Sequence, residues 1–181
     1  STLSYVPVST KAKELSDISL ATYSRLTAGF ALAIEEYLAD KNCRDYEKVL
    51  GQNLEAFYSE KAFFLSSFDL SGIQDFIYNI ATAGATEQLK ARSLYLDFMG
   101  EHIADSLLEK LELTRANLLY VGGGHAYFIL PNTEKTRETL ASFEAEFNQF
   151  LVKHFQTGLY VAFGWSPFSA NDMTTTLADY R

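Results

Sequence analysis

Three consecutive glycines and a histidine interrupt an apolar stretch at residues 117–130. Gly122, Gly123 and Gly124 separate two runs of β-type residues, and His125 begins the second run. Glycines adopt positive φ and leave the backbone open to close approach, because they carry no Cβ. Two glycines suffice for a tight turn. The pattern therefore predicts a β-hairpin whose tip is approached by a phosphate or another chain, and a tight hairpin alone is the alternative.

A second break in the apolar pattern carries a carboxylate and a hydroxyl. A strand-like run ends at Asp69, and Ser71 and Gly72 precede a helix that begins at Ile73. The Ser71 hydroxyl and the N–H groups of Gly72 and Ile73 are expected to bind a phosphate, because a helix N-terminus favours negative charge. Gln74 is expected to brace this loop. Asp69 is the candidate metal ligand, and a helix cap is the alternative for Asp69 and Ser71.

The position of each basic side chain indicates whether it can contact a ligand. His125 is expected to hydrogen-bond a phosphate or a ribose, with a buried histidine as the alternative. Lys90 and Arg92 stand two apart on a helix, so at most one of them faces the site, and Arg92 is the better phosphate ligand. A solvated pair is the alternative. His102 and His154 lie in apolar helical stripes, which predicts core or boundary positions.

Hydrophobic periodicity divides the chain into a helical segment and a part that mixes strands with helices. The first helix begins at a cap at Asp17 or Ser19 and is expected to bury a face that includes Tyr23. Later, a helix that buries Phe143 and Phe150 is expected to begin at Thr133. The expected elements are a helix to about residue 40, a weakly helical stretch at 45–57 interrupted by Gly51, a strand from Ala62 to Asp69, a short helix from Ile73, a long helix at 86–111, the glycine hairpin, a helix from Thr133 that Gly158 terminates, a strand at 159–165, a turn at Pro167 and a helix from Asn171 or Asp172.

This order of elements predicts an α+β protein. From Ala62 onward it follows the ferredoxin-like βαββαβ pattern, in which an antiparallel sheet carries helices on one face. The first strand then neighbours the central hairpin, so Asp69 is expected to meet the glycine tip and His125. The chain is expected to divide into a helical segment at 1–60 and a palm-like domain at 61–181.

Composition narrows the classes of function. The 181 residues are 48% hydrophobic and carry a net charge of −8, so the surface as a whole repels nucleic-acid phosphates. With one cysteine, Cys43, and three histidines, no Cys/His metal cluster is expected. A lone cysteine cannot form an internal disulfide, so a reducing, intracellular environment is expected. No apolar run reaches the length of a membrane span, and the start lacks a signal peptide. A start without methionine is typical of a fragment.

Five runs follow one another along the chain: FDLSGIQDFI at 68–77, LKARS at 89–93, EHI at 101–103, RANLLYVGGGH at 115–125 and GWS at 164–166. Together and in this order they resemble the large signature subunit of type III-A CRISPR effector complexes, the Csm type. They match the first palm domain of that family. The segment around residues 17–28 is similar to its linker between an HD nuclease domain and the palm, although Tyr23 stands where that linker usually shows a histidine.

The resemblance implies a nucleotide-binding role in antiviral defence. In that family two GGDEF-like palm domains face each other, bind ATP and join it into cyclic oligoadenylates when target RNA is bound. The resemblance thus implies ATP and Mg²⁺ as ligands, both held with a second palm domain of the same subunit. It also implies other Csm subunits as partners, guide and target RNA as indirect ones, and a prokaryotic cytoplasm. The candidate nucleotide-binding residues are Asp69, Ser71, Gly72, Gln74, Arg92, Gly122, Gly123, Gly124 and His125.

The sequence departs from the family pattern at the point that matters for catalysis. The metal-binding Gly-Gly-Asp-Asp motif of the second palm is absent, and His125 follows the glycines here. Two-metal phosphoryl transfer needs clustered carboxylates, whereas Asp69 stands alone. The HD nuclease signature is absent as well. We therefore expect the chain alone to bind nucleotide weakly and to catalyse nothing. The alternative is a structural module that docks neighbouring effector subunits without binding nucleotide.

Overall fold

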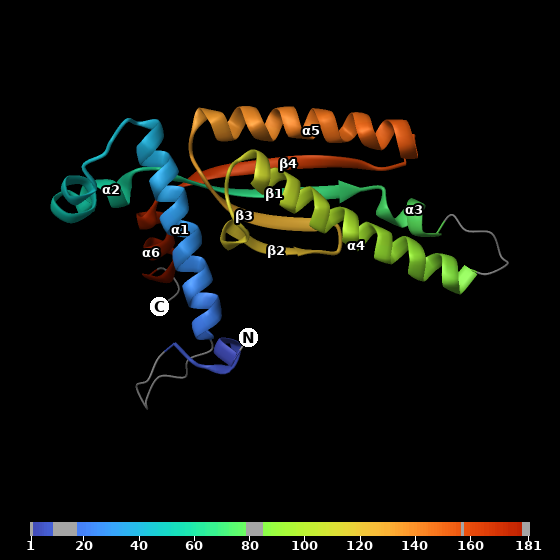
Figure 1. Cartoon of the computed structure of the whole chain (residues 1–181), viewed down its shortest axis with the longest axis horizontal. Coiled ribbons are helices and arrows are strands. Elements are labelled where there is room, and N and C mark those ends of the chain that lie inside the picture. Colours follow the sequence, from blue (N-terminus) through green and yellow to red (C-terminus); the bar gives the residue numbers. More distant parts are fainter. Residues whose placement is uncertain (1, 9–17, 79–84, 157, 179–181) are drawn as a thin grey trace.

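The computed structural model describes residues 2–8, 18–78, 85–156 and 158–178. Its α-helices and strands follow the order that the sequence predicts, with short 3₁₀ and π turns between them (Figure 1). The elements are η1 (Thr2–Tyr5), α1 (Leu20–Asp40), η2 (Glu47–Gln52), α2 (Leu54–Ser59), β1 (Phe63–Ser71), α3 (Ile73–Tyr78), α4 (Ala85–Lys110), η3 (Arg115–Asn117), β2 (Leu118–Gly122), β3 (His125–Pro131), α5 (Glu134–Phe155), β4 (Tyr160–Phe168) and α6 (Ala170–Ala178).

The four strands form one antiparallel sheet in the order β2-β3-β1-β4. This order confirms the ferredoxin-like prediction. Alternate residues of β1, Phe64, Phe68 and Leu70, are buried in a core shared with α4 and α5. The two long helices therefore cover one face of the sheet. The opposite face, which carries Leu65, Asp69 and the other alternate residues, is called the open face below.

Helix α1 covers one end of the open face. In Figure 1 it crosses the strands, whereas α5 runs along them. Its buried side packs on Phe63 and Ile129, and the rings of Phe30 and Phe63 meet edge to face with centroids 5.2 Å apart. A Cβ at Gly29 would overlap the carbonyl oxygen of Ala116, so a glycine permits this close approach.

One of the two predicted caps of α1 is confirmed, whereas several side chains on the helices differ from the sequence expectations. Ser19 caps α1, and its side chain accepts a hydrogen bond from the N–H of Thr22. Tyr23 and Phe150 are 52% and 43% exposed, because each lies at the margin of its helix's apolar stripe. His102 and His154 are exposed rather than core residues, on the solvent sides of α4 and α5.

The boundaries of α5 and β4 also differ. Thr133 caps α5 as predicted, but the helix ends at Phe155, before Gly158, with Gln156 at φ 56° as its C-cap. The predicted turn at Pro167 is wrong, because β4 continues through it to Phe168. A proline is tolerated there since β4 is an edge strand, and one side of its backbone has no strand to bond.

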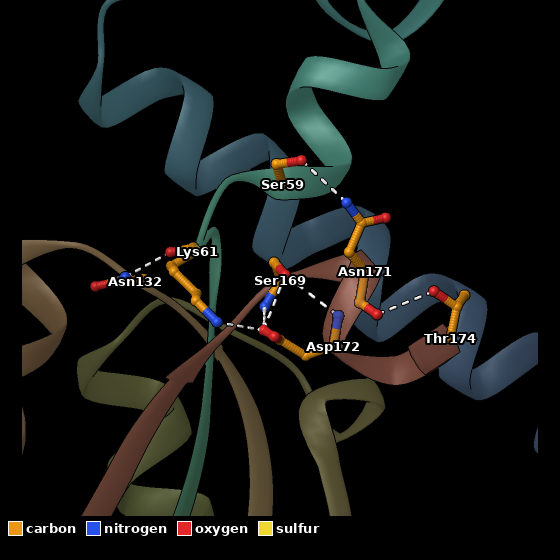
Figure 2. Close-up of polar contacts among 7 residues, drawn as sticks. All are labelled: Ser59, Lys61, Asn132, Ser169, Asn171, Asp172 and Thr174. Atoms are coloured by element: carbon orange, nitrogen blue, oxygen red, sulfur yellow. Dashed lines mark hydrogen bonds and ion pairs between the residues drawn. The ribbon is translucent and has the colours of Figure 1, made fainter. Parts of the chain in front are cut away.

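Helix α6 is fixed by a small polar network (Figure 2). The Ser169 hydroxyl accepts from the N–H of Asp172, while the Asp172 carboxylate accepts from the N–H and hydroxyl of Ser169. This reciprocal cap starts the helix at Ala170, one or two residues before the predicted start at Asn171 or Asp172. Lys61 forms an ion pair with Asp172 at 2.5 Å and ties the helix to the beginning of β1. No helix in the described ranges combines the length and apolar character needed to cross a membrane.

Candidate functional site

Asp69, Ser71 and His125 meet on the open face, as the sequence predicts; they are called the polar trio below. Asp69 faces His125 across the β1–β3 ladder. His125 Nδ1 lies 2.7 Å from Asp69 Oδ1, and the Ser71 hydroxyl donates to Asp69 Oδ2 at 2.7 Å. The side chains of Asp69 and His125 are 49% and 53% exposed. The trio is therefore a connected network that solvent or a ligand can reach.

The β2–β3 turn places the backbone beside this trio. Gly123 and Gly124 have φ of 60° and 83°, and positive φ at both central residues is typical of the tight type I′ turn. The N–H of Leu70 donates to the carbonyl of Gly124 at 2.8 Å, which extends the β1–β3 ladder to the tip. The turn geometry thus accounts for two of the three glycines without a ligand.

Packing explains most of the glycines, and one remains open. A Cβ at Gly72, where φ is 85°, would overlap the carbonyl oxygen of Gly158, and one at Gly124 would overlap Ile73. No heavy atom lies within 4 Å of a Cβ built at Gly123. Gly123 is therefore the position of the tip that a ligand can approach most closely.

The residues after Gly72 have a smaller role than the sequence suggests. Helix α3 has only six residues, so its dipole at Gly72 and Ile73 is weak. Gln74 is exposed on the first turn of α3. The guanidinium of Arg92 donates to the carbonyl of Phe76 and lies over the Phe76 ring at 5.2 Å. These contacts make Arg92 a brace of α3 rather than a member of the polar trio.

The acidic side chains of the site do not form a metal cage by themselves. Among the described residues, no group of three or more His, Cys, Asp or Glu side chains is arranged to hold a metal ion. Asp69 shares its two oxygens between His125 and Ser71. On the other side of the sheet, Arg115 binds a carboxylate of α4, and its hydrogen bonds to Asp105 lower the pKa of that carboxyl. Asp69 as a metal ligand therefore stays a prediction from the sequence.

Two further features of the open face were not singled out in the sequence. Tyr120, Tyr127 and Tyr160 surround the polar trio; the two-residue spacing of Tyr127 from His125 is a pattern that predicts a shared face. An apolar groove of about 320 Å³ lies at the end nearest α1 and α6. It is lined by Phe30, Leu65, Leu119, Ile129, Ser166, Phe168 and Met173.

Comparison with known proteins gives consistent matches. Residues 62–181 match the family model described as Csm1 subunit domain B. The chain is 69% identical to the CRISPR system single-strand-specific deoxyribonuclease Cas10/Csm1 (subtype III-A) of Streptococcus thermophilus, over 97% of this chain and 23% of that protein.

Solved structures agree in fold. A Csm1-Csm4 cassette in complex with cA4 has a TM-score of 0.75 and 33% identity, over 93% of this chain and 21% of that chain. A Csm1-Csm4 cassette in complex with one ATP has a TM-score of 0.70 and 34% identity, over 86% and 20%. The chain thus spans less than a quarter of the length of these relatives.

Proposed function

The chain belongs to the Csm1 family of type III-A CRISPR systems, and we propose that it supplies one half of an ATP-binding pocket for cyclic oligoadenylate synthesis. The other half would come from a second palm domain outside these 181 residues. The observation that carries the proposal is the polar trio beside the open backbone of Gly123 on an uncovered part of the sheet. Homologous cassettes that contain ATP or cA4 support it.

The three members of the polar trio have different roles in the proposed pocket. Ser71 donates its proton to Asp69, so it binds a phosphate oxygen only after the hydroxyl turns away from the carboxylate. That turn would free Asp69 Oδ2 for the Mg²⁺ that accompanies ATP and neutralises its phosphates. His125 stays in place through Nδ1 and presents Nε2 to the ligand. The site is thus arranged to position a nucleotide.

In this proposal the second palm domain carries the catalytic residues. One carboxylate cannot hold the metal pair that in-line phosphoryl transfer uses. We infer that this palm is non-catalytic, that guide and target RNA act on it indirectly, and that purified chain turns over no ATP.

Nucleotide binding tests the proposal. With the second palm present, ATP and Mg²⁺ should shift the amide signals of Ser71, Gly72 and Gly123, and Ser71→Ala should weaken the response several-fold. Ser142→Ala is the matched control, because Ser142 is exposed on α5, away from the open face. An unchanged spectrum at saturating ATP would reject nucleotide binding by this half.

One observation favours the alternative, a docking module without nucleotide. The apolar groove exposes almost only carbon atoms, and a surface of that kind fits a protein neighbour. The homologous cassettes contain Csm4. If docking is the whole function, Met173→Lys in the groove should abolish subunit assembly. Ser71→Ala should then change neither subunit assembly nor the response to ATP.

A further inference from the structure

Three half-exposed tyrosines surround the polar trio on the open face. Tyr120 on β2 is 55% exposed, Tyr127 on β3 is 45% exposed and Tyr160 on β4 is 54% exposed. A tyrosine ring left in contact with water is a large apolar surface that has not been used in the core. Their position beside the trio therefore requires an explanation.

The strand register places these rings in ordered rows. Tyr127 lies directly opposite Tyr120 on one side and Ser67 on the other, and Ser67 faces Gly164. The neighbouring row contains Asp69 and His125. Adjacent rows on one face are separated by two residues, or about 7 Å. Tyr127 thus stands one row from the trio, with only small residues beside it toward β4.

Gly122 explains how Tyr120 joins this surface. A Cβ at position 122 would lie 2.8 Å from the Tyr120 hydroxyl. Gly122 is itself paired with His125. The missing side chain thus leaves room for the Tyr120 ring to extend toward the tip, next to the polar trio. The third glycine, which the tight turn does not require, has this packing role.

Charge restricts what the tyrosine surface can bind. The four strands contain no Lys or Arg. A polynucleotide backbone needs several cations to replace its counterions, so these strands do not form a track for one. Stacking on a base requires no charge, because every base has a π face. The surface therefore fits a base better than a phosphodiester chain.

The geometry points to Tyr127, flanked by Tyr120, as the stacking platform for the purine base of the bound nucleotide. The inference rests on the proposed function, since the polar trio and Gly123 hold the phosphates of the same molecule. A ribose bridges the one-row separation between the two subsites. Tyr127 is then a binding residue that contributes affinity through the base, whereas the polar trio contributes affinity through the phosphates.

Two ligands that differ only in the base test this assignment. In the full-length parent subunit, Tyr127→Ala should weaken ATP binding about tenfold or more. It should leave the affinity for ribose 5-triphosphate, which lacks the base, unchanged. Tyr127→Phe should bind ATP as the wild type does, because it keeps the ring. Tyr58→Ala is the matched control, since Tyr58 is 42% exposed on α2, away from the strands.

The possible outcomes distinguish a failure of the stacking assignment from a failure of the proposed function. If Tyr127→Ala leaves ATP affinity unchanged while Ser71→Ala weakens it, the stacking assignment is wrong and the proposed function stands. An equal loss for ATP and ribose 5-triphosphate would show that Tyr127 acts through the fold, and would overturn stacking. If the wild-type subunit binds neither ligand, the proposed function fails and the stacking platform with it.

Discussion

Asp69 is held at both of its carboxylate oxygens, and this arrangement defines the site. Oδ1 faces His125 Nδ1 and Oδ2 accepts from Ser71. A carboxylate held in this way keeps His125 with its proton on Nδ1, because an ionised carboxylate can only accept. The same two contacts compete with a metal for Asp69. Under the proposed function, this competition explains why a second domain would be needed to hold Mg²⁺.

The glycines separate structural need from ligand contact, and two Gly→Ala variants should show it. Gly72→Ala should lower the free energy of unfolding by about 3 kcal/mol or more, because its Cβ meets the backbone of Gly158 at positive φ. Gly123→Ala should cost only about 1 kcal/mol, the penalty of the left-handed conformation. Urea unfolding measures both values. Equal losses would mean that Gly123 is also packed.

The encounter of Asp69 with His125 was predictable, because strand order and antiparallel pairing follow from the sequence of elements. The role of Arg92 was not predictable, since its partner is the backbone carbonyl of Phe76, which no residue pattern reveals. The tyrosine surface was missed for another reason. Tyr120, Tyr127 and Tyr160 come from three strands, and only the register brings them to one face.

Strand β4 illustrates how a helix can protect a sheet edge. The Asn148 side chain on α5 donates to the carbonyl of Val161 at 2.7 Å and accepts from its N–H at 2.8 Å. The Glu144 carboxylate accepts from the N–H of Phe163. These contacts occupy backbone groups that would otherwise pair with another chain.

Removing the Asn148 side chain should destabilise the β4 edge of the sheet. Asn148→Ala leaves both polar groups of Val161 without these partners and should lower the free energy of unfolding by about 1–2 kcal/mol. The Val161 amide should also exchange its hydrogen faster. Gln149→Ala, at an exposed neighbouring position, should change the stability by less than about 0.5 kcal/mol. If the Val161 amide exchanges no faster in the variant, the Asn148 contacts do not stabilise the edge.

The docking of α6 should depend on pH through Asp172. The ion pair with Lys61, assisted by hydrogen bonds from Ser169, lowers the pKa of Asp172 from 3.8 to about 2. A lowered folded-state pKa means that the contribution is complete above about pH 4 and is lost as the pH falls toward 2. Lys61→Met should raise the pKa of Asp172 toward 3.8, as measured by carboxyl NMR titration. An unchanged titration would show that Lys61 is not the dominant partner.

Elements built from long periodic patterns were predicted well, and short ones less well. The amphipathic patterns of α1, α4 and α5 gave their ends to within about three residues, because apolar spacing decides burial. The π-helical turn η2 was seen only as weakly helical sequence, since its hydrogen bonds leave no periodic signature. The start of α6 depends on Ser169, which caps the helix together with Asp172. Their three-residue spacing is typical of a capping box, so this start could have been predicted from the sequence.

At the level of the whole chain, the open face divides into a covered end and an available end. Helix α1 and α6 line the apolar groove, whereas the polar trio lies beside the β2–β3 tip. The division into segments 1–60 and 61–181 stays a prediction. Against it stands the packing of α1, because Ala33, Tyr37 and Leu38 share a core with Phe63 and Ile129.

The contact between α1 and the segment at Ala116 and Asn117 tests whether α1 and the sheet unfold together. The buried Asn117 side chain donates to the carbonyls of Gly29 and Ile129, both at 3.0 Å, and so links α1 to β3. Gly29→Ala places a Cβ against the Ala116 backbone and should lower the free energy of unfolding by about 1–3 kcal/mol, despite the better helix propensity of alanine. Gly100→Ala is the matched control. Its Cβ meets Val121 at an ordinary 3.8 Å, so the gain in helix propensity should raise stability by about 0.5–1 kcal/mol.

Hydrogen exchange on the Gly29→Ala variant reads out the cooperativity. If α1 and the sheet form one unit, the amides of β3 should lose protection as much as those of α1, because both open in a single transition. Loss of protection confined to α1 would instead establish residues 1–60 as a separate segment. In the first case a partner that binds α1 would also stabilise the strand that carries His125 and Tyr127. Under the proposed function, docking at one end of the open face would then be coupled to nucleotide binding at the other.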